Sequence, residues 1–392
     1  MKKYLSLLLI IAMLLGVCLS VSSCTEDEED VADQSESQSE SESESESDTE
    51  KQTEDQKDEG PSYQLVKDNL DKFNIVGRCP VTDMGAVSGW SASGIEFRVK
   101  GSGDVYIVAR SETKAGEYLV YVDGKAFGVV RFPTYVTTAT LGLNLKDEEK
   151  TIGLYRITNN EEGMKAATTI FTRVGIDGEI CEYKSDKKLI EFVGDSITCG
   201  YGLHRTESGK AFDGTRAYTF TLAQKLGYEH SVLSTSGIGV YLGSDRNNTK
   251  GNMSVHYDCT NYLRSTSDKY ATEDKKADIV VINLNTNDND HGGNDSETEY
   301  KNAVRTLIGK VRNIHGNDAK VVWVVGMMRP ESCNVNDWMK EILNNELGGE
   351  ANGYYVVSVT QDNSGGGDHP SYAAHNVVVE EIEAFLKQKN LV

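Results

Sequence analysis

The hydrophobic pattern of this chain changes at about residue 186, and that change limits the choice of fold more than any other feature. Beyond it, short runs rich in Val and Ile alternate with segments that have the periodicity of a helix. Strands that alternate with helices predict a parallel sheet with helices on its faces, an α/β domain over residues 186–392. The predicted strands are 189–193, 232–235, 279–284, 321–325 and 355–359, and the predicted helices are 217–226, 298–314, 338–347 and 372–386.

Residues 61–185 predict a separate all-β domain. Residues 95–99 alternate apolar and polar side chains, as a half-buried strand does. Asp123-Gly124 lies between two further strand-like runs and marks a hairpin turn. Short strands separated by Gly and Asp turns favour a β-sandwich, in which we expect Trp90 and Tyr155 to lie in the core or at its rim. The other candidate strands are 105–109, 118–122, 129–132 and 150–155.

The first 24 residues predict an export signal. Lys2 and Lys3 precede a mostly apolar stretch over residues 5–21, which is too short and too early for a membrane-spanning helix. The stretch runs into Val-Ser-Ser-Cys24, which resembles the cleavage box of bacterial lipoproteins. That resemblance implies a lipid on Cys24, whereas in an ordinary signal peptide Cys24 would have no role. We therefore expect an exported protein that meets the membrane of the bacterial cell envelope only through a lipid anchor at Cys24.

Residues 25–60 carry most of the formal net charge of -21. They are rich in alternating Ser and Glu, contain no aromatic residue, and have Val31 as their only large aliphatic residue. Such a segment cannot bury enough apolar area to offset chain entropy, so we expect a disordered tether, with an acidic interaction tail as the alternative. Because phosphate binding needs clustered cations, so acidic a chain is not expected to bind nucleic acid. We expect a monomer.

Polar residues follow the predicted strands of the α/β domain. The first run is followed by Ser196, the second by Gly237 and the third by Asn287, and His369 precedes the last helix. In an open parallel sheet, sites form beyond the carboxyl ends of the strands, so these four residues should meet. A Ser hydroxyl is a weak nucleophile that needs an adjacent base, and His suits that role near neutral pH. A Gly N–H and an Asn amide are donors that a tetrahedral oxyanion needs, so the set indicates acyl transfer.

These four blocks resemble those of the SGNH, or GDSL-like, hydrolases, which supply Ser, Gly, Asn and His in this order. Here they are Gly-Asp-Ser196, Ser-Gly237, Thr-Asn287-Asp and His369-Pro. The longer string EFVGDSITCGYG over 191–202 looks like the family-two carbohydrate esterases, the acetylxylan esterases. YRITNNE over 155–161 looks similar too, as does a β domain placed before the hydrolase. The resemblance covers about residues 70–392.

The resemblance implies a flavodoxin-like three-layer α/β/α domain after a jelly-roll sandwich, and deacetylation of plant-type polysaccharides such as xylan or mannan, often at sugar O6. It implies no metal and no organic cofactor. Ser196 would attack the ester carbonyl, and His369 would take its proton and return it to the leaving sugar. The N–H groups of Ser196 and Gly237, with the Asn287 amide, would hold the oxyanion. We expect Asp195 to be a structural turn residue.

The sequence departs from the family pattern in two places. The third block usually begins with Gly, but here Asn285 stands there; Asn is the next residue to tolerate left-handed backbone, so Asn287 should keep its place. The family usually carries an Asp three residues before the His, where this chain has Gly366. We therefore favour a Ser–His dyad in which a backbone carbonyl holds the imidazole. Asp368 or Asp362 is the alternative orienting acid.

Three further groups have simple explanations. The run Asp288-Asn-Asp-His291 is rich in metal ligands but lacks the final acid of a calcium loop, so we expect a solvated loop. His375 lies within a predicted helix, where a capping or surface role is expected rather than that of a second base. Trp338 follows a polar loop and is a candidate sugar-stacking platform, with core packing as the alternative. Trp323 lies within an apolar strand and is expected in the core.

The sequence therefore predicts a tethered serine esterase that removes acetyl groups from a polysaccharide such as xylan, mannan or glucomannan. Three alternatives stay open: another SGNH activity such as a lipase, a thioesterase or a deacetylase of the cell's own envelope glycan; a non-catalytic surface glycan-binding protein; and an acetyltransferase with a sugar acceptor. The string over 191–202 argues against a lipase. The intact Ser196, Asn287 and His369 argue against a pure binding protein.

Overall fold

The computed structural model of the 392-residue chain describes most of both predicted domains. The predictions for the export signal, for lipidation at Cys24 and for nearly all of the acidic tract lie outside the described residues, as does His291. Within the part that is described, no helix is both long and apolar enough to cross a membrane. The described ranges are 60–159, 167–203, 212–244, 251–271, 275–289, 296–329 and 331–392.

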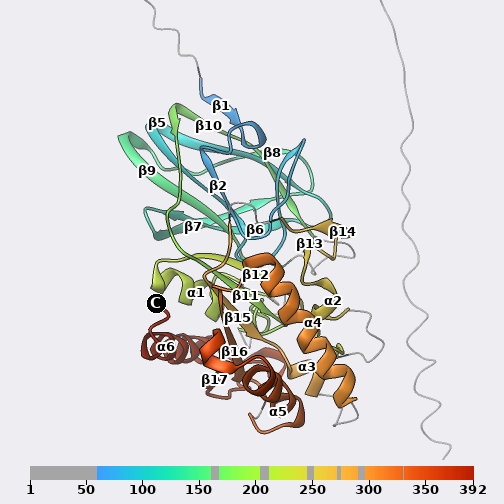
Figure 1. Cartoon of the computed structure of the whole chain (residues 1–392). Helices are drawn as coiled ribbons and strands as arrows, with labels where there is room; N and C mark the ends of the chain where they lie inside the picture. Colours follow the sequence, from blue (N-terminus) through green and yellow to red (C-terminus); the bar gives the residue numbers. More distant parts are fainter. Residues whose placement is uncertain are drawn as a thin grey trace, which may run out of the picture. The chain divides into compact units, whose positions relative to one another are not determined.

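The first domain is a ten-stranded antiparallel sheet (Figure 1). The main path runs β3-β4-β10-β5-β9-β6-β7; β1 pairs with β10, and β2 and β8 pair with β5. A short 3-10 turn, Val66–Asp68, follows β1. The strands are β1 (Ser62–Leu65), β2 (Phe73–Val76), β3 (Val81–Thr82), β4 (Gly85–Ser88), β5 (Gly94–Ser111), β6 (Gly116–Val122), β7 (Lys125–Phe132), β8 (Thr137–Thr140), β9 (Leu145–Arg156) and β10 (Thr169–Cys181).

The predicted strands 95–99 and 105–109 are one strand, β5, and this is a correction to the sequence analysis. Gly101 and Gly103, which lie between the two predicted strands, are at an irregularity where the pairing of β5 with β9 shifts register. Glycine in a strand often marks such a bulge, because a bulge bends the strand without ending it. The hairpin prediction is confirmed: Asp123 and Gly124 have φ of 49° and 74°, and Val122 pairs with Lys125. Two left-handed residues are typical of the type I′ turn.

The second domain is built on a five-stranded parallel sheet with the order β12-β11-β15-β16-β17. Its strands match all five predicted apolar runs to within a few residues. In chain order this is the 2-1-3-4-5 arrangement of flavodoxin-like folds, whose ligand site forms where the order reverses, here between β11 and β15. The strands are β11 (Leu189–Gly194), β12 (Glu229–Ser234), β15 (Ile279–Asn283), β16 (Lys320–Gly326) and β17 (Tyr354–Val359). A separate two-stranded hairpin joins β13 (Cys259–Asn261) to β14 (Ser265–Lys269).

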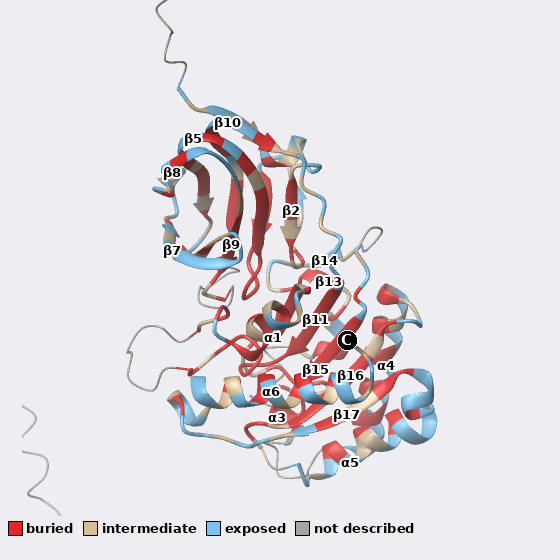
Figure 2. Cartoon of the chain, turned by 90° about the vertical axis from the view of Figure 1, so that its left-hand side faces the viewer, coloured by how far each residue is buried: buried red, intermediate tan, exposed pale blue. Residues whose placement is uncertain are grey.

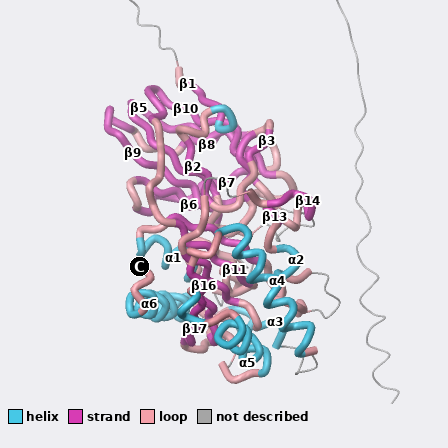
Figure 3. The backbone as a smooth tube through the Cα atoms, in the orientation of Figure 1, coloured by secondary structure: helices cyan, strands magenta, loops and turns pink. Residues whose placement is uncertain are grey.

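Helices cover both faces of this sheet, as the alternating pattern predicts (Figure 3). On one face α1 (Tyr218–Leu226) packs beside α6 (Tyr372–Gln388). The other face carries α4 (Glu297–His315), with α2 (Met253–His256) and α5 (Asn334–Glu341) beside it. Single turns complete the domain: α3 (Thr286–Asn289), a π-helical turn at Ile342–Glu346, and 3-10 turns at Gly349–Asn352 and Gly366–Asp368.

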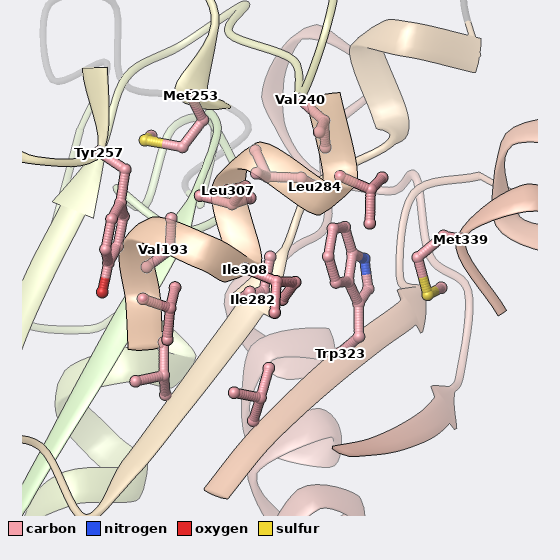
Figure 4. Close-up of a cluster of buried hydrophobic side chains, with 14 of the residues drawn as sticks. Val193, Val240, Met253, Tyr257, Ile282, Leu284, Leu307, Ile308, Trp323 and Met339 are labelled. Carbon is pink, nitrogen blue, oxygen red and sulfur yellow. The ribbon is translucent and has the colours of Figure 1, made fainter. Parts of the chain in front are cut away.

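The core of the second domain follows from the alternation of side chains along its strands. Val193, Ile282 and Trp323 from three neighbouring strands are buried in the same cluster as Leu307 and Ile308 of α4 (Figure 4). The intervening residues of the same strands are buried against α1 and α6. Both faces of this parallel sheet are therefore shielded from water, which explains why its strands are continuous apolar runs in the sequence. The prediction that Trp323 lies in the core is confirmed.

The two domains share a buried boundary (Figure 2). Trp90 of the first domain is fully buried, packs against Tyr262 and donates its indole N–H to the carbonyl of Thr260 at 2.9 Å. Tyr155 is also buried, with its ring 5.0 Å from that of Phe220 on α1. These two aromatic residues, expected in the core or at the rim of the β domain, therefore help to hold it against the α/β domain.

Candidate active site

Ser196 lies in a tight turn that directly follows β11. The Asp195 carboxylate accepts the N–H of Ile197 at 3.0 Å, and the carbonyl of Ser196 accepts the N–H of Tyr201 at 2.9 Å. A Cβ on Gly194 would lie 2.0 Å from the Thr198 hydroxyl, so only glycine fits where the strand turns. The serine is 4% exposed and lies at the carboxyl edge of the sheet, beside the point where the strand order reverses.

His369 meets Ser196 as the sequence predicts. Its Nε2 lies 2.8 Å from the Ser196 hydroxyl, and its Nδ1 lies 2.8 Å from the carbonyl oxygen of Gly367. A carbonyl can only accept a hydrogen bond, so Nδ1 carries the proton and Nε2 turns its lone pair to the serine. The ring of Tyr201 packs edge-on against the imidazole at 4.7 Å. The site thus has the tautomer that a general base needs.

Neither candidate acid contacts the imidazole of His369. Asp368 is exposed, has a φ of 58°, and makes no hydrogen bond with any residue in the described ranges. Asp362 instead accepts the N–H groups of Ser371 at 2.9 Å and Ser364 at 3.1 Å, which holds the loop before α6. Among the described residues, the Gly367 carbonyl is the acceptor that lies within hydrogen-bond distance of Nδ1, and the Ser–His dyad stays a prediction.

Three groups are candidate donors to an oxyanion: the N–H groups of Ser196 and Gly237 and the side-chain amide of Asn287. Gly237, with a φ of 82°, follows β12, and neither its N–H nor that of Ser196 has a hydrogen-bond partner in the described part of the chain. Asn287 on α3 donates through Nδ2 to the carbonyl of Ile238 at 2.8 Å and to Asp195 at 3.3 Å. The longer of these two bonds is the weaker, so its hydrogen is the one that an oxyanion could take.

The buried carboxylates of Asp195 and Asp288 fix the backbone of the loops that carry these donors. Asp288 is fully buried and accepts the N–H groups of Val240, Tyr241 and Leu242 at 2.8, 2.9 and 3.0 Å, so it fixes the loop that follows Gly237. Burial, with the nearby Asp288 carboxylate adding to it, raises the pKa of Asp195 to about 7. Asp195 is a turn residue, as expected, whereas the solvated loop expected from residue 288 onward is wrong for Asp288.

Asn285 takes the left-handed conformation that glycine would usually supply. Its φ is 88°, and its buried amide donates to Asn336 at 2.8 Å and accepts the Tyr300 hydroxyl. Those two bonds offset the strain of a positive φ on a residue that has a Cβ. The substitution of Asn for Gly in the third block therefore leaves Asn287 where the site needs it.

Trp338 and His375, which the sequence analysis considered as candidates, pack within the structure of the α/β domain. Trp338 on α5 is half-buried, with its ring 5.9 Å from that of Tyr300, and it packs against the core, in line with the core-packing alternative. His375 is fully buried and accepts the N–H of Tyr218 at 3.0 Å, so it caps α1. Burial lowers the pKa of His375 to about 3, which keeps it neutral. His375 is close enough to His369 for that ring to contribute to the lowered pKa of His375.

The structure explains why the string Cys-Gly-Tyr-Gly202 ends in glycine, which the sequence pattern alone did not. Gly202 has a φ of 73°, and a Cβ there would lie 2.3 Å from the carbonyl of Gly366 and 2.9 Å from the Cβ of His369. The loop after the nucleophile therefore packs directly on the loop that carries the base. Only glycine permits this approach, because both the backbone angle and the space exclude a side chain.

The first domain also reaches the site through two side chains that the sequence analysis did not identify. Ser91 donates to the carbonyl of Cys199, in the nucleophile loop, at 3.1 Å. Asn159 donates to the carbonyl of Ser234, at the end of β12, at 3.3 Å. The YRITNNE string contains Asn159 and was the one sequence feature from which its role could have been predicted. In the described ranges, no group of three or more His, Cys, Asp or Glu side chains is arranged to hold a metal ion.

Residues 190–382 match the family model described as GDSL-like Lipase/Acylhydrolase. Cellulase/esterase CelE of Acetivibrio thermocellus is 27% identical over 319 residues, which cover 76% of this chain and 37% of that protein. An acetylxylan esterase / glucomannan deacetylase of Cellvibrio japonicus is 23% identical over 217 residues, which cover 52% of this chain and 60% of that protein. The chain thus spans less than two thirds of the length of either relative.

Among solved structures, a family two carbohydrate esterase from Cellvibrio japonicus has a TM-score of 0.73 at 16% identity. The match covers 84% of this chain and 98% of that one, and it shows a shared fold. The predicted SGNH-hydrolase fold and the resemblance to the family-two esterases are confirmed. The jelly-roll topology of the first domain stays a prediction.

Proposed function

We propose, from the premise that residues 190–382 form a GDSL-like lipase/acylhydrolase domain, that this protein is a serine esterase that removes O-acetyl groups from polysaccharide. One observation carries the proposal: the imidazole of His369 lies between the Ser196 hydroxyl and the Gly367 carbonyl, at 2.8 Å from each. The curated relatives named as an esterase and as an acetylxylan esterase / glucomannan deacetylase support the choice of an acetylated glycan.

The reaction runs through an acyl-enzyme. Ser196 Oγ attacks the acetyl carbonyl while His369 Nε2 takes its proton; the carbonyl oxygen becomes an oxyanion and accepts hydrogen bonds from Ser196 N–H, Gly237 N–H and Asn287. As the tetrahedral intermediate collapses, the imidazolium returns the proton to the sugar oxygen, and acetyl-Ser196 and a free sugar hydroxyl remain. Water, deprotonated by His369, then attacks the acetyl-enzyme and releases acetate. Throughout, His369 Nδ1–H donates a hydrogen bond to the Gly367 carbonyl, which stabilises the imidazolium.

The experiment that tests this function is acetate release from acetylated xylan, acetylated glucomannan and 4-nitrophenyl acetate, with the Ser196→Ala variant in parallel. Release from the glycans that is lost in the variant supports the proposal. Release from 4-nitrophenyl acetate alone points to another SGNH esterase, and acetylated envelope glycan is then the next substrate. No release, with glycan still bound, would replace the proposal with a glycan-binding protein. Acetyl transfer to an added sugar would identify a transferase.

Asp368→Asn is expected to leave kcat/KM for 4-nitrophenyl acetate within about twofold of the wild type, because this carboxylate makes no bond to His369. Asn also tolerates the positive φ of this position, so the variant changes the charge and not the backbone. The check is a pair of initial-rate curves. A loss approaching ~10⁴-fold, typical of a triad acid, would contradict the dyad.

Asn287→Ala is expected to lower kcat by about 10²–10³-fold, because one preorganised oxyanion donor is removed. Asn285→Gly is the matched control two residues away, since glycine readily adopts the φ of 88° found there and touches no reacting atom. Steady-state kinetics with 4-nitrophenyl acetate, beside thermal melts of both variants, provide the measurement. A loss below about threefold in a folded Asn287→Ala protein would remove this residue from the site.

We also propose that the chain is exported and anchored through a lipid on Cys24, with the acidic tract as a tether. The support is the sequence alone: the basic start, the apolar stretch over 5–21 and the Val-Ser-Ser-Cys24 box. A surface location suits an enzyme whose substrate is a polymer outside the cell.

A further inference from the structure

A cleft of about 490 Å³ lies where the β6–β7 hairpin of the first domain meets α1 and the start of α6. Figure 1 shows β6 and β7 next to α1 at the domain boundary. The volume is within the ~300–1,000 Å³ of ordinary ligand sites. We call this the hairpin cleft, and its members used below are Tyr121, Asp213, Arg216, Phe220, Gln224 and Tyr372.

Aromatic rings form one part of the hairpin cleft. Tyr121 is held by edge-on contacts with Tyr155 at 5.4 Å and with Phe220 at 5.6 Å, so its ring is fixed before any ligand arrives. Tyr372, the first residue of α6, is 43% exposed, and the guanidinium of Arg216 lies 5.8 Å from its ring centre. A half-buried tyrosine beside an exposed one, each with an apolar face and a hydroxyl tip, suits ligands that are apolar on one face and hydroxylated at the edge, as sugar rings are.

Polar side chains form the other part, and their charges cancel. Arg216 lies 3.6 Å from Asp213, whose carboxylate also accepts the Thr215 hydroxyl at 2.8 Å. Thr221 and Gln224, one turn apart on α1, are half-buried members of the same cleft. Among the described residues that line the cleft, one acid and one base balance each other, so they offer no net charge to an ionic ligand. The chemistry that remains is hydrogen bonding to a neutral, polyhydroxylated molecule.

The hairpin cleft lies one loop away from the catalytic pair. Tyr372 follows His369 by three residues, so their Cα atoms are at most roughly 11 Å apart. Its N–H donates to the carbonyl of Leu203 at 3.2 Å, and the N–H of Asp213 donates to the carbonyl of Gly200 at 2.9 Å. Both acceptors belong to the loop that follows Ser196. A ligand that occupies the cleft and the active site together must therefore be a chain.

We propose that the hairpin cleft binds neutral, unacetylated sugar residues of the same polysaccharide chain whose acetyl group enters the Ser196 site. This inference rests on the proposed function and names a second contact with its substrate. It also gives the β domain a part in substrate binding, because Tyr121 comes from β6 and the facing residues come from α1 and α6.

The test compares Tyr372→Ala and Gln224→Ala with Tyr135→Ala, an exposed tyrosine of the first domain outside the cleft. For each protein we measure kcat/KM with acetylated glucomannan and divide it by that with 4-nitrophenyl acetate. Loss of one stacked ring is expected to lower this ratio about tenfold for Tyr372→Ala, through KM for the polymer. Gln224→Ala should lower it severalfold, and the Tyr135→Ala ratio should equal that of the wild type. Thermal melts confirm that each variant is folded.

Binding without catalysis separates this inference from the proposed function. In full-length protein carrying Ser196→Ala, calorimetry measures the affinity for unacetylated glucomannan oligosaccharides and for oligogalacturonates of equal length. Neutral chains that bind, and bind about tenfold more weakly when Tyr372→Ala is added, support the cleft even where no acetate is released from any ester. An affinity that is unchanged when Tyr372→Ala is added, no binding by the parent, or preference for the charged chains would overturn it, whatever the esterase activity.

Discussion

Replacing Ser196 with alanine is expected to abolish acetate release, with kcat falling by about 10⁶-fold, while the fold is kept. The substitution removes only the hydroxyl group, whose oxygen lies 2.8 Å from His369 Nε2. In an acyl-enzyme mechanism no other group can form the covalent intermediate, and the residual rate is that of the oxyanion donors alone. The loss in stability should be small, because the serine side chain is little more than an alanine in volume.

The measurement is single-turnover and steady-state hydrolysis of 4-nitrophenyl acetate, with mass spectrometry of the acid-quenched enzyme. The wild type should gain one acetyl group on the peptide that contains Ser196, and the variant should gain none. Ser254→Ala is the matched control, a buried serine on α2 whose hydroxyl donates to the side chain of Asn252 at 3.0 Å. Adding His369→Ala to Ser196→Ala should cost little more, since the two residues act as one unit. Turnover by Ser196→Ala above ~1% of the wild-type rate would contradict the assignment of Ser196 as the nucleophile.

Local patterns in the sequence were sufficient for most of the fold. The five apolar runs of the α/β domain became its five strands because each is a strand buried on both faces, and the Asp123-Gly124 turn needs only its own two residues. The strand β5 was divided in two, and the other strands that the sequence analysis missed are β1, β2, β3, β4, β8 and β10. The division reflects pairing: β9 and β10 pair with the chain on both sides of Gly101, so the bulge there bends β5 without ending it.

The candidate site shows the same limit. The order Ser196, Gly237, Asn287, His369 was readable because parallel strand ends meet at one edge of a sheet. The group that accepts the imidazole hydrogen bond could not be assigned to a particular residue from the sequence. It is a backbone carbonyl, that of Gly367, and its position depends on that residue's φ of 60°. Contacts from the first domain to the loops of the site depend on how two domains pack, and no spacing within one chain segment encodes that.

The second large effect concerns Arg78, a fully buried residue of the first domain. Its guanidinium donates to both carboxylate oxygens of Glu191, at 2.8 and 3.0 Å, and to the carbonyls of Tyr257 and Cys259. Glu191 is equally buried and lies on β11, the strand that ends at the nucleophile turn. Arg78→Met removes the cation but leaves the anion in a dry site. We expect the free energy of unfolding to fall by about 3–5 kcal/mol.

Burial decides the size of that effect, and the chain contains a control. Arg305 and Glu346 form the same two-bond pair, at 2.7 and 2.8 Å, on the surface. Water already solvates those charges, so Arg305→Met should change the midpoint of urea unfolding far less than Arg78→Met does. Comparable shifts for the two variants would show that the buried pair contributes no more than a surface one. Adding Glu191→Gln to Arg78→Met should restore part of the loss, because the unpaired charge is then gone.

The pH dependence of unfolding gives an independent reading of the same pair. Burial alone would raise the pKa of Glu191, but Arg78 and His315 together hold it well below its ordinary range. A carboxylate whose folded pKa is depressed stabilises the protein fully above its unfolded pKa, about 4.3, and that contribution is lost as the pH falls toward the folded value. In Arg78→Met the main group that lowers this pKa is gone and burial raises it, so the variant's Glu191 takes up a proton at a higher pH than the wild-type carboxylate does. The gap in stability between wild type and Arg78→Met should therefore be largest at about pH 8 and narrow as the pH falls toward about 4. A gap that widened on acidification would mean that the buried group is not an anion held by Arg78.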